Sequence, residues 1–369
     1  MKFTVSRDAL LSPLQLVSGV VERRQTLPVL ANILMVLDED RLSLTGTDTE
    51  VEVIGRLQTE MTEVTGEITV PAKKLVDICR SLPDDAMLSF EQDESDRILL
   101  RSGRSRFTLS TLPASDFPAT DSATEGDIRF SSPQFVIKRL IDRTAFAMAQ
   151  QDVRYYLNGM LWEVDGKRLR CVATDGHRLA MCTRELDIDL PEKHQAILPR
   201  KGVIELSRLL KENEEAAQLT LSHHYIRVET DEYTLTSKLV DGKFPDYERV
   251  LPVGGNNIVT GDRNELKQAF SRTAILSNEK YRGVRLNFGD NLLTILANNP
   301  EQEEAEEQVV VDYPGDNIEI GFNVSYLQDI CNVLDSENLK ITLTDANGSA
   351  LLEEATENDS VYVVMPMRL

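Results

Sequence analysis

The chain opens with the extended stretch Lys2-Phe3-Thr4-Val5, which leads directly into a helical segment over residues 7–20. The same order of an extended entry and a following helix occurs twice more, with a period of about 126 residues. The later copies are Ile128-Arg129-Phe130 before residues 133–149 and Asn257-Ile258-Val259 before residues 263–276. A threefold internal repeat therefore determines the architecture of this chain.

A second set of landmarks keeps the same spacing. These pairs are Pro71-Ala72-Lys73-Lys74 with Pro199-Arg200-Lys201, Asp77-Ile78-Cys79 with Asp329-Ile330-Cys331, and Phe117-Pro118 with Phe244-Pro245. Chance similarity does not keep one offset at a helix start, a helix core and a strand end. The repeat predicts three domains, at residues 1–125, 126–253 and 254–369, each near the usual domain size.

Within each repeat, short alternating segments predict strands and two one-sided segments predict helices. Strands are expected at residues 41–44, 50–54, 168–173, 178–182, 292–296 and 308–311. Helical stripes are formed by Leu10, Leu14, Val17 and Val21 and by Leu75, Ile78, Cys79 and Leu82. Such helices must pack on a sheet, so we predict an α+β fold of three similar two-helix, antiparallel-sheet domains. Residues 116–127 and 252–257 are the expected connectors.

The bulk composition indicates a soluble protein of the cytoplasm. The first residues lack the apolar stretch of a secretory signal, and no apolar run approaches the roughly 18 residues of a membrane-spanning helix. Cys79 and Cys331 occupy equivalent places in their repeats, which favours small buried positions over a redox role. Cys171 and Cys182 lack metal-ligand spacing, so no metal or other cofactor is expected.

The formal net charge of −21 argues at first against nucleic acid as a partner. The charge is unevenly distributed, however. The six predicted helices sum to +6 and the rest of the chain to −27; the helices are residues 7–24, 72–82, 136–150, 199–212, 263–272 and 325–338, and only the last is acidic. If the helices share a face, that face is positive. The alternative is a helical surface that carries Lys and Arg for solubility.

The number of helices indicates a ring. Six helices side by side enclose a hole of roughly 8 Å, which is too small for DNA. Twelve helices from two chains enclose roughly 25 Å, which admits a duplex about 20 Å across. We therefore predict a head-to-tail dimer, a closed ring of six domains with sheets outside and helices inside, in which sheet edges pair from one domain to the next.

The two ends of the chain carry opposite charges. The third repeat holds Glu301, Glu303, Glu304, Glu306 and Glu307, while the first repeat ends with Arg101, Arg104 and Arg106 beside Phe107 and Leu109. Opposite charges at opposite ends suit a heterologous contact between two chains. A solvated loop is the alternative interpretation of the glutamate run.

Catalysis is not expected. Asp175 with His177, and the pair His223-His224, are incomplete as acid/base or metal groups, because neighbouring strand residues point apart and no third ligand follows at metal spacing. Asp175-Gly176 also has the turn chemistry of a plain hairpin. A peptide-binding scaffold that never touches DNA remains a competing class, which does not need the basic helices.

The full chain resembles one known family, the bacterial sliding clamps, which are the beta subunits of DNA polymerase III. The resemblance rests on residues 101–107 (RSGRSRF), 152–160 (DVRYYLNGM), 173–180 (ATDGHRLA), 298–307 (NNPEQEEAEE) and 363–369 (VVMPMRL). The family forms a dimeric ring of six similar domains, the DNA clamp fold, that encircles double-stranded DNA without sequence specificity. An ATP-driven clamp loader opens the ring.

The resemblance implies a processivity factor that tethers the replicative polymerase and other partners, including translesion and repair polymerases, by short peptide motifs. It places an apolar peptide-binding pocket between the second and third repeats. The implied pocket residues are Leu157, Thr174, Gly176, His177, Arg178, Leu179, Pro245, Arg249, Val250, Asn323, Tyr326, Ser349, Val363, Met365, Pro366, Met367 and Arg368. Such aliphatic, Pro and Met side chains make an adaptable trough.

The same resemblance implies two further surfaces. DNA contact is expected from Arg24, Gln151, Tyr155 and Tyr156, and from the basic helix residues Lys73, Lys74, Arg80, Lys138, Arg139, Arg200 and Lys201. Tyrosine can stack on unpaired bases, although a core role for one of the two is equally open. The dimer interface is expected to join Phe107, Leu109, Ile275 and Leu276, with Lys74, Arg104 and Arg106 paired to Glu301, Glu303 and Glu304.

Overall fold

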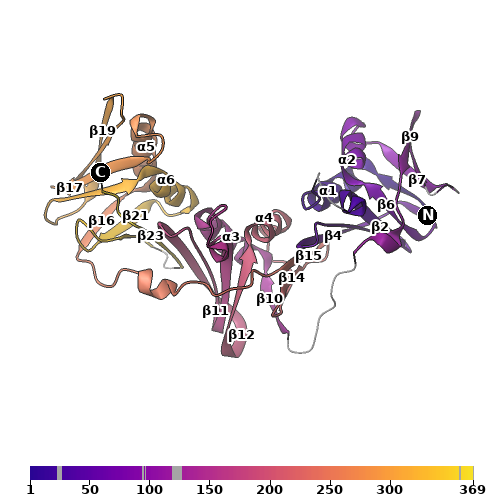
Figure 1. Ribbon diagram of the computed structural model, residues 1–369, viewed down its shortest axis with the longest axis horizontal. Helices are drawn as coiled ribbons and strands as arrows, with labels where there is room; N and C mark the ends of the chain where they lie inside the picture. The colour runs from indigo at the N-terminus through magenta and orange to yellow at the C-terminus, as the bar shows by residue number, and fades with distance from the viewer. Residues whose placement is uncertain (23–26, 94, 96, 119–126, 357–358, 369) are drawn as a thin grey trace. The chain divides into compact units, whose positions relative to one another are not determined.

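The structure is a computed structural model that describes residues 1–22, 27–93, 95, 97–118, 127–356 and 359–368, with the backbone alone for residues 187–191. The chain divides into two compact units (Figure 1). Unit 1 contains Met1–Ile137 and Lys201–Leu239, and unit 2 contains Lys138–Arg200 and Val240–Leu369. Each unit therefore takes one whole end repeat and part of the middle repeat.

Unit 1 contains two antiparallel sheets. Their strands are β1 (Lys2–Ser6), β2 (Asn32–Asp38), β3 (Arg41–Thr47), β4 (Val51–Gln58), β5 (Met61–Val64), β6 (Gly66–Pro71), β7 (Met87–Gln92), β8 (Arg97–Ser102), β9 (Ser105–Ser110), β10 (Ile128–Pro133), β13 (Ala216–Leu221), β14 (Tyr225–Glu229) and β15 (Tyr233–Lys238). The first sheet has the order β5-β1-β7-β8-β9, and the second has the order β10-β13-β14-β15-β4-β3-β2-β6.

Unit 2 contains one sheet of ten strands, in the order β11-β12-β23-β22-β21-β16-β19-β18-β17-β20. The strands are β11 (Gly159–Thr174), β12 (Arg178–Pro199), β16 (Asn257–Asp262), β17 (Gly283–Gly289), β18 (Leu292–Asn298), β19 (Glu304–Asp312), β20 (Ile318–Asn323), β21 (Asn338–Leu343), β22 (Ala350–Glu354) and β23 (Ser360–Val364). The predicted strands and the predicted hairpin turn at Asp175-Gly176 are confirmed, because β11 ends at Thr174 and β12 begins at Arg178.

The sheets pass from one repeat to the next without a break. In unit 1, β15 of the middle repeat pairs with β4 of the first repeat, from Tyr233 opposite Gly55 to Ser237 opposite Val51. In unit 2, β12 pairs with β23 of the third repeat, starting with Arg178 opposite Val364. The prediction that sheet edges join within the chain is confirmed. Each join satisfies backbone groups that an open edge would leave exposed.

Each repeat carries two α-helices, and each helix follows a strand directly. They are α1 (Arg7–Ser18), α2 (Ala72–Ser81), α3 (Gln134–Thr144), α4 (Arg200–Leu209), α5 (Arg263–Thr273) and α6 (Val324–Val333). The strand ends supply N-caps: the side chains of Ser6, Asp262 and Asn323 accept hydrogen bonds from backbone N–H groups in the first turns of α1, α5 and α6. One capping residue thus ends the strand and starts the helix.

Several helices are shorter than the sequence pattern predicts. Helix α1 ends at Ser18 rather than 24, α3 at Thr144 rather than 150, and α6 at Val333 rather than 338. After α3 the chain tightens into the 3-10 turn η3 (Ala145–Ala147). After α6, Leu334 is extended and the chain turns toward β21. The apolar pattern continued past these ends because single apolar residues just beyond them, Val20, Ala147 and Leu334, are buried in the core as well.

The helices pack side by side in pairs, α1 with α2 and α5 with α6 (Figure 1). Leu10, Leu14 and Val17 of α1 are fully buried, as the stripe predicted. The helix approaches β3 so closely that a Cβ atom at Gly46 would lie 2.6 Å from the Val17 carbonyl oxygen. Glycine is required at Gly46 for this contact.

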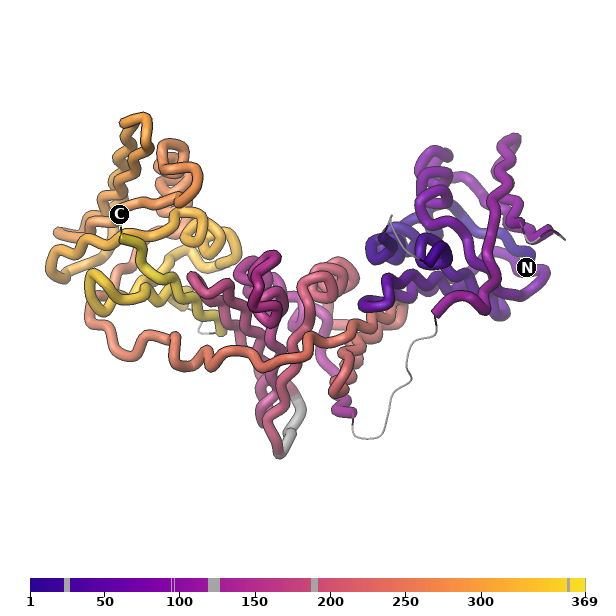
Figure 2. The backbone as a smooth tube through the Cα atoms, viewed as in Figure 1, coloured from indigo at the N-terminus to yellow at the C-terminus, as the bar shows by residue number. Residues whose placement is uncertain are grey.

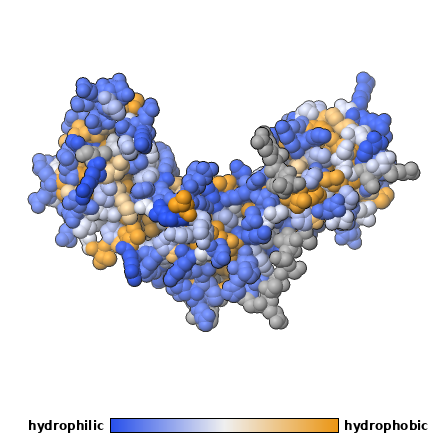
Figure 3. Space-filling model, viewed as in Figure 1, coloured by the Kyte–Doolittle hydropathy of each residue, from blue (hydrophilic) through white to orange (hydrophobic). Residues whose placement is uncertain are grey.

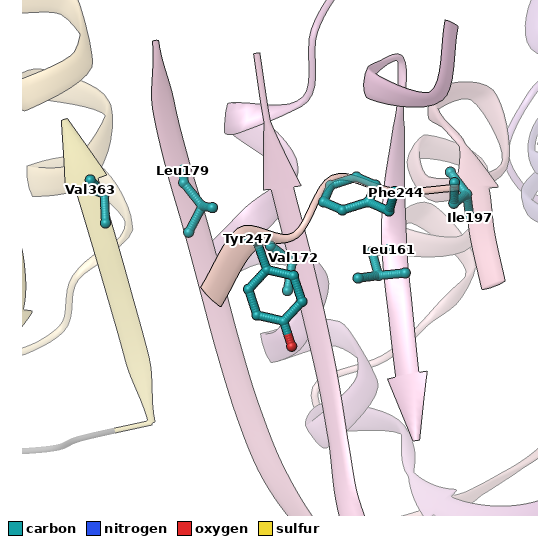
Figure 4. Close-up of a cluster of buried hydrophobic side chains, with 7 residues drawn as sticks. All are labelled: Leu161, Val172, Leu179, Ile197, Phe244, Tyr247 and Val363. Carbon is teal, nitrogen blue, oxygen red and sulfur yellow. The ribbon is translucent and has the colours of Figure 1, made fainter. Parts of the chain in front are cut away.

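One face of the β11–β12 hairpin is covered by the segment that follows β15. In this segment Phe244 and Tyr247 pack on Leu161, Val172, Leu179, Ile197 and Val363, which together form one buried cluster (Figure 4). Tyr247 opens the short 3-10 turn η5 (Tyr247–Val250). Figure 2 shows this segment running across the strands of unit 2. The four cysteines are free and buried, which confirms the expected buried positions.

Hydrophilic side chains cover much of the face drawn in Figure 3. Within the residues described, no helix is both long enough and apolar enough to cross a membrane.

Arg143 of α3 tests how strongly the middle repeat is attached to the third. It is 3% exposed and pairs with Asp335 at 2.6 Å and with Glu354, itself 1% exposed, at 3.0 Å. Replacing Arg143 with Ala leaves the Glu354 carboxylate buried without its cation, so unit 2 should lose about 3–5 kcal/mol of stability. Urea unfolding followed by the fluorescence of Trp162, the single tryptophan, measures this loss.

The matched control is Arg249→Ala, because the Arg249–Asp246 pair is largely exposed. It should cost less than about 1 kcal/mol. Equal losses in the two variants would contradict the importance of the buried pair.

Candidate functional site

The turn between β11 and β12 forms one end of a pocket in unit 2. The Asp175 carboxylate accepts hydrogen bonds from the backbone N–H groups of His177 and Arg178, at 2.9 and 3.1 Å. Gly176 has a φ of +89°, and the Thr174 hydroxyl donates to the Arg178 carbonyl oxygen at 2.6 Å. The Asp-Gly pair therefore sets a rigid turn, and it leaves His177 exposed.

The pocket has a volume of about 150 Å³. Four segments of unit 2 meet there: the 3-10 turn η4 (Tyr155–Leu157), the β11–β12 turn, the segment around η5, and the end of β23. The lining residues are Arg154, Leu157, Thr174, Gly176, Arg178, Leu179, Pro245, Tyr247, Val250, Val363 and Met365. Buried aliphatic side chains dominate its base, so it suits an apolar side chain of a partner.

Arg178 lines the pocket, yet its charge is already neutralised. Its guanidinium donates to Asp175, to the Asp329 carboxylate of α6 and to the Phe146 carbonyl oxygen. The same group lies 4.4 Å from the centroid of the Tyr326 ring. Burial raises the pKa of the Tyr326 hydroxyl, with a further contribution from Asp175. Arg178 is thus held rigidly between the turn and α6.

The residues after β23 are fixed beside the pocket by backbone hydrogen bonds. The Met365 N–H donates to the His177 carbonyl oxygen at 2.9 Å, and the Met367 N–H donates to the Gly321 carbonyl oxygen at 2.7 Å. These bonds tie the chain end to the β11–β12 turn and to β20. Met365 is 38% exposed at the rim, so a flexible thioether borders the opening.

The structure brings together part of the predicted pocket set and adds two residues. Eight predicted residues lie outside the lining, although several adjoin it in sequence: His177, Arg249, Asn323, Tyr326, Ser349, Pro366, Met367 and Arg368. Arg154 and Tyr247 line the pocket but were not predicted. Arg154 stands inside the recognised stretch 152–160, and Tyr247 follows the Phe244-Pro245 landmark of the repeat. Neither a turn-bound arginine nor a buried aromatic gives a separate sequence signal.

The loop before η4 and η4 itself carry three of the residues expected at DNA. Gln151 is exposed with a φ of +55°. Arg154 donates hydrogen bonds to the carboxylate of Asp152. These bonds lower the pKa of the Asp152 carboxyl to about 2. Tyr155 is 56% exposed, whereas Tyr156 packs against the buried cluster. The open question between the two tyrosines is answered: Tyr155 is the exposed ring.

The basic helix residues fall into two groups. Lys73, Lys74 and Arg80 are exposed on α2. The others, Lys138, Arg139, Arg200 and Lys201, are partly buried and hydrogen bonded. In that second group, Arg139 pairs with Asp335 and Asp359 of the third repeat. Lys201 bonds to Glu22 and Asp48 of the first repeat. Arg139 and Lys201 therefore also fasten neighbouring repeats together. Arg24 lies outside the described residues.

The residues expected at the dimer contact lie on or beside β9 and β19, on α2 and in the turn after α5. In unit 1, Arg104 and Arg106 are exposed at β9, an edge strand of its sheet, while Phe107 is half-buried and Leu109 buried. Lys74 is exposed on α2.

In unit 2, Ile275 is 75% exposed in the 3-10 turn η6 (Ala274–Leu276), and Leu276 is half-buried. Glu301, Glu303 and Glu304 are exposed at the start of β19. Val310 on β19 is also 73% exposed. Glu307 is bonded to Arg272 of the same chain at 2.6 and 2.8 Å, so it is already paired.

Across the described residues, no group of three or more His, Cys, Asp or Glu side chains is arranged to hold a metal ion. Three copies of a module of two helices and a sheet, joined to one another by strand pairing, define a repeat protein with an apolar pocket.

Comparisons with known proteins identify the family. Three family models match in succession: the N-terminal, central and C-terminal domains of the DNA polymerase III beta subunit, at residues 1–121, 132–246 and 248–368. The beta sliding clamp of Pseudomonas aeruginosa is 61% identical over 369 residues, and that of Escherichia coli strain K12 is 53% identical, with full coverage of both chains in each case.

Comparisons with solved structures give the same family. A crystal structure of the Pseudomonas aeruginosa sliding clamp bound to griselimycin matches with a TM-score of 0.97 at 61% identity. The Bartonella birtlesii clamp bound to griselimycin matches with a TM-score of 0.95 at 38% identity, and both matches cover all of each chain. The chain belongs to the family of DNA polymerase III beta subunits, the sliding clamps, which are non-catalytic.

The Lys201–Asp48 pair gives unit 1 a pH dependence. Burial alone would raise the pKa of Asp48, but hydrogen bonds from Lys201 and from two backbone N–H groups outweigh it and hold the pKa below its ordinary value. The stability from Asp48 is therefore complete above the unfolded pKa of about 3.9 and is lost as pH falls through the lower folded pKa. Asp48→Asn should flatten the loss of stability between pH 5 and pH 2, measured by thermal unfolding.

Lys201 does not contribute to this acid dependence. Its pKa is raised, because bonds to Asp48 and Glu22 outweigh burial, so its share of stability is lost only at alkaline pH. Asp40→Asn, which removes an exposed carboxylate, should follow the unaltered chain. An unchanged acid slope in Asp48→Asn would contradict the assignment.

Proposed function

We propose that the chain is a processivity factor of DNA replication, which encircles duplex DNA and tethers the replicative polymerase. The observation that carries this proposal is the match over the whole length of the chain to sliding clamps, together with the three joined repeats. Two chains would form a closed ring of six domains, and the domain limits of 1–125, 126–253 and 254–369 belong to this proposal.

The ring would close head to tail between strand edges of opposite charge. In the described part of the chain, β9 pairs only with β8, and β19 pairs with β16 only through Val311 and Asp312. Arg104 and Arg106 on the first edge complement Glu301, Glu303 and Glu304 on the second. The exposed Ile275 and the half-buried Leu276 and Phe107 would supply apolar contact inside the charged rim.

Helices would line the ring, and sheets would face outward. On that arrangement the phosphates of the DNA would be contacted by Lys73, Lys74 and Arg80. These contacts would not depend on base sequence, because cationic side chains that do not enter the grooves interact only with the sugar-phosphate backbone. Gln151 and Tyr155, both exposed on one loop, would contact DNA with Arg24. Lys138, Arg139, Arg200 and Lys201 would contribute positive potential while they hold their internal partners.

The pocket of unit 2 would receive short apolar peptide motifs of partner proteins, which include the clamp loader and the replicative, translesion and repair polymerases. Its support is the apolar lining and the neutralised Arg178 at its wall. Griselimycin, which binds two related clamps, would occupy this pocket. We place the protein in the cytoplasm, in keeping with four unpaired cysteines.

Two sets of variants test whether peptide binding and DNA contact use separate surfaces. Met365→Lys places a charge at the pocket rim and should weaken griselimycin binding at least about tenfold, because an apolar ligand would then bury a charge. Met61→Lys changes a methionine that is 54% exposed on β5 and is the matched control. Titration calorimetry measures the binding. The clamp loader would itself use this pocket, so DNA contact is measured without the loader, on short primed DNA, and should be unaltered in both variants.

Arg24→Ala and Gln151→Asn should reverse that pattern, with weaker binding to primed DNA and unaltered griselimycin affinity. Asparagine is chosen because it tolerates the left-handed backbone of Gln151. Loss of both activities in either set would count against two separate sites.

A further inference from the structure

One wall of the pocket is built on a segment with little regular structure. Pro245, Tyr247 and Val250 come from the connector between β15 and β16, which contains only the short turn η5. At its start, the Val240 N–H donates to the Ile197 carbonyl oxygen at 2.9 Å. A wall without a strand ladder needs side-chain contacts to hold its position.

Tyr247 supplies such a contact. It is 3% exposed, and its ring belongs to the buried cluster of unit 2. Its hydroxyl points away from the connector and along the strands beneath (Figure 4). There it donates to Oε1 of Glu163 at 2.8 Å and accepts from Nη1 of Arg170 at 2.7 Å. One face of Tyr247 therefore lines the pocket, while its polar end is anchored in the hairpin.

Glu163 is the centre of this anchor. It is 1% exposed and lies opposite Gln195 in the β11–β12 register. Its Oε2 accepts from Nε2 of Gln195 at 2.6 Å and pairs with Lys193 at 2.8 Å, while Arg170 lies 3.2 Å from its Oε1. Both carboxylate oxygens are occupied by donors from two paired strands. Although burial opposes ionisation, the bonds from Lys193, Gln195 and Tyr247 hold the pKa of Glu163 below its ordinary value.

Arg170 completes the anchor from the next part of β11. Its Nε donates to the Thr183 hydroxyl at 3.0 Å, and Thr183 is its partner across the strands. The donors to Glu163 are thus themselves oriented by the sheet. A buried network in which each member is satisfied is rigid, and it passes that rigidity to Tyr247.

We propose that Glu163 is a positioning residue for the peptide pocket: through the Tyr247 hydroxyl, it fixes the wall formed by Pro245, Tyr247 and Val250. This inference rests on the proposed function of the pocket and deepens it. A wall held in place before a ligand arrives costs less to order on binding, so the network acts on affinity. The competing explanation is that the network only stabilises unit 2.

Affinity for griselimycin, measured by calorimetry on the full chain, separates these explanations. Glu163→Gln and Tyr247→Phe should each weaken binding by roughly 5- to 30-fold, the range expected for loss of a buried charge-assisted hydrogen bond. The double variant should bind no more weakly than the weaker single variant, because both changes break the same link. Tyr247→Phe keeps the ring, so it tests the link even if Glu163→Gln unfolds the chain.

The matched control is Glu354→Gln. Glu354 is 2% exposed and ion paired in the same unit, but it does not line the pocket. It should lower stability, as reported by Trp162 fluorescence, and leave griselimycin affinity unchanged.

Unchanged affinity in both Glu163→Gln and Tyr247→Phe would overturn the inference and leave the pocket assignment intact. Failure of the unaltered chain to bind griselimycin would remove the pocket assignment itself, and the inference with it.

Discussion

Backbone pairing across sheet edges joins the repeats within each unit of the chain. A sheet edge presents unpaired N–H and C=O groups, and a repeat with two edges must have them paired or protected. Here β15 pairs with β4, and β12 pairs with β23, so the middle repeat contributes one strand to each neighbour. Because these bonds are part of the sheets, the repeats cannot separate without breaking the units. Among the backbone edges left open in the described residues are β9 and the part of β19 before Val311, which are the edges proposed to meet a second chain.

Ion pairs between repeats lie beside these strand pairings. Arg139, Arg143 and Lys201 emerge from helices next to a join and bind carboxylates of the neighbouring repeat. Such pairs hold a helix of the middle repeat against the neighbouring repeat, beside the strand pairing. The strongly acidic composition is therefore compatible with basic helices, because part of the acid neutralises cations inside the chain.

Much of this architecture is predictable from sequence. Phe117-Pro118 and Phe244-Pro245 revealed the period, and Asp175-Gly176 revealed the hairpin that forms the pocket end. Pairing of strands between repeats was expected, but no local sequence pattern predicts that β4 pairs with β15. The pairing of Lys201 with Asp48 and the anchoring of Tyr247 by Glu163 were not predictable, because each depends on residues far apart in the chain. The periodicity of apolar residues predicts which face of a helix or strand is buried. It does not predict which distant residue that face contacts.

Encirclement is the interaction proposed to hold the protein on DNA. Topological retention depends on DNA ends, whereas direct grip on phosphates depends mainly on salt. The most direct measurement loads the protein on nicked circular DNA with the clamp loader, linearises half of the sample, and determines how much protein stays bound to each form. If the protein encircles DNA, it should be retained on circular DNA and lost from linear DNA. Equal retention on both forms would contradict it.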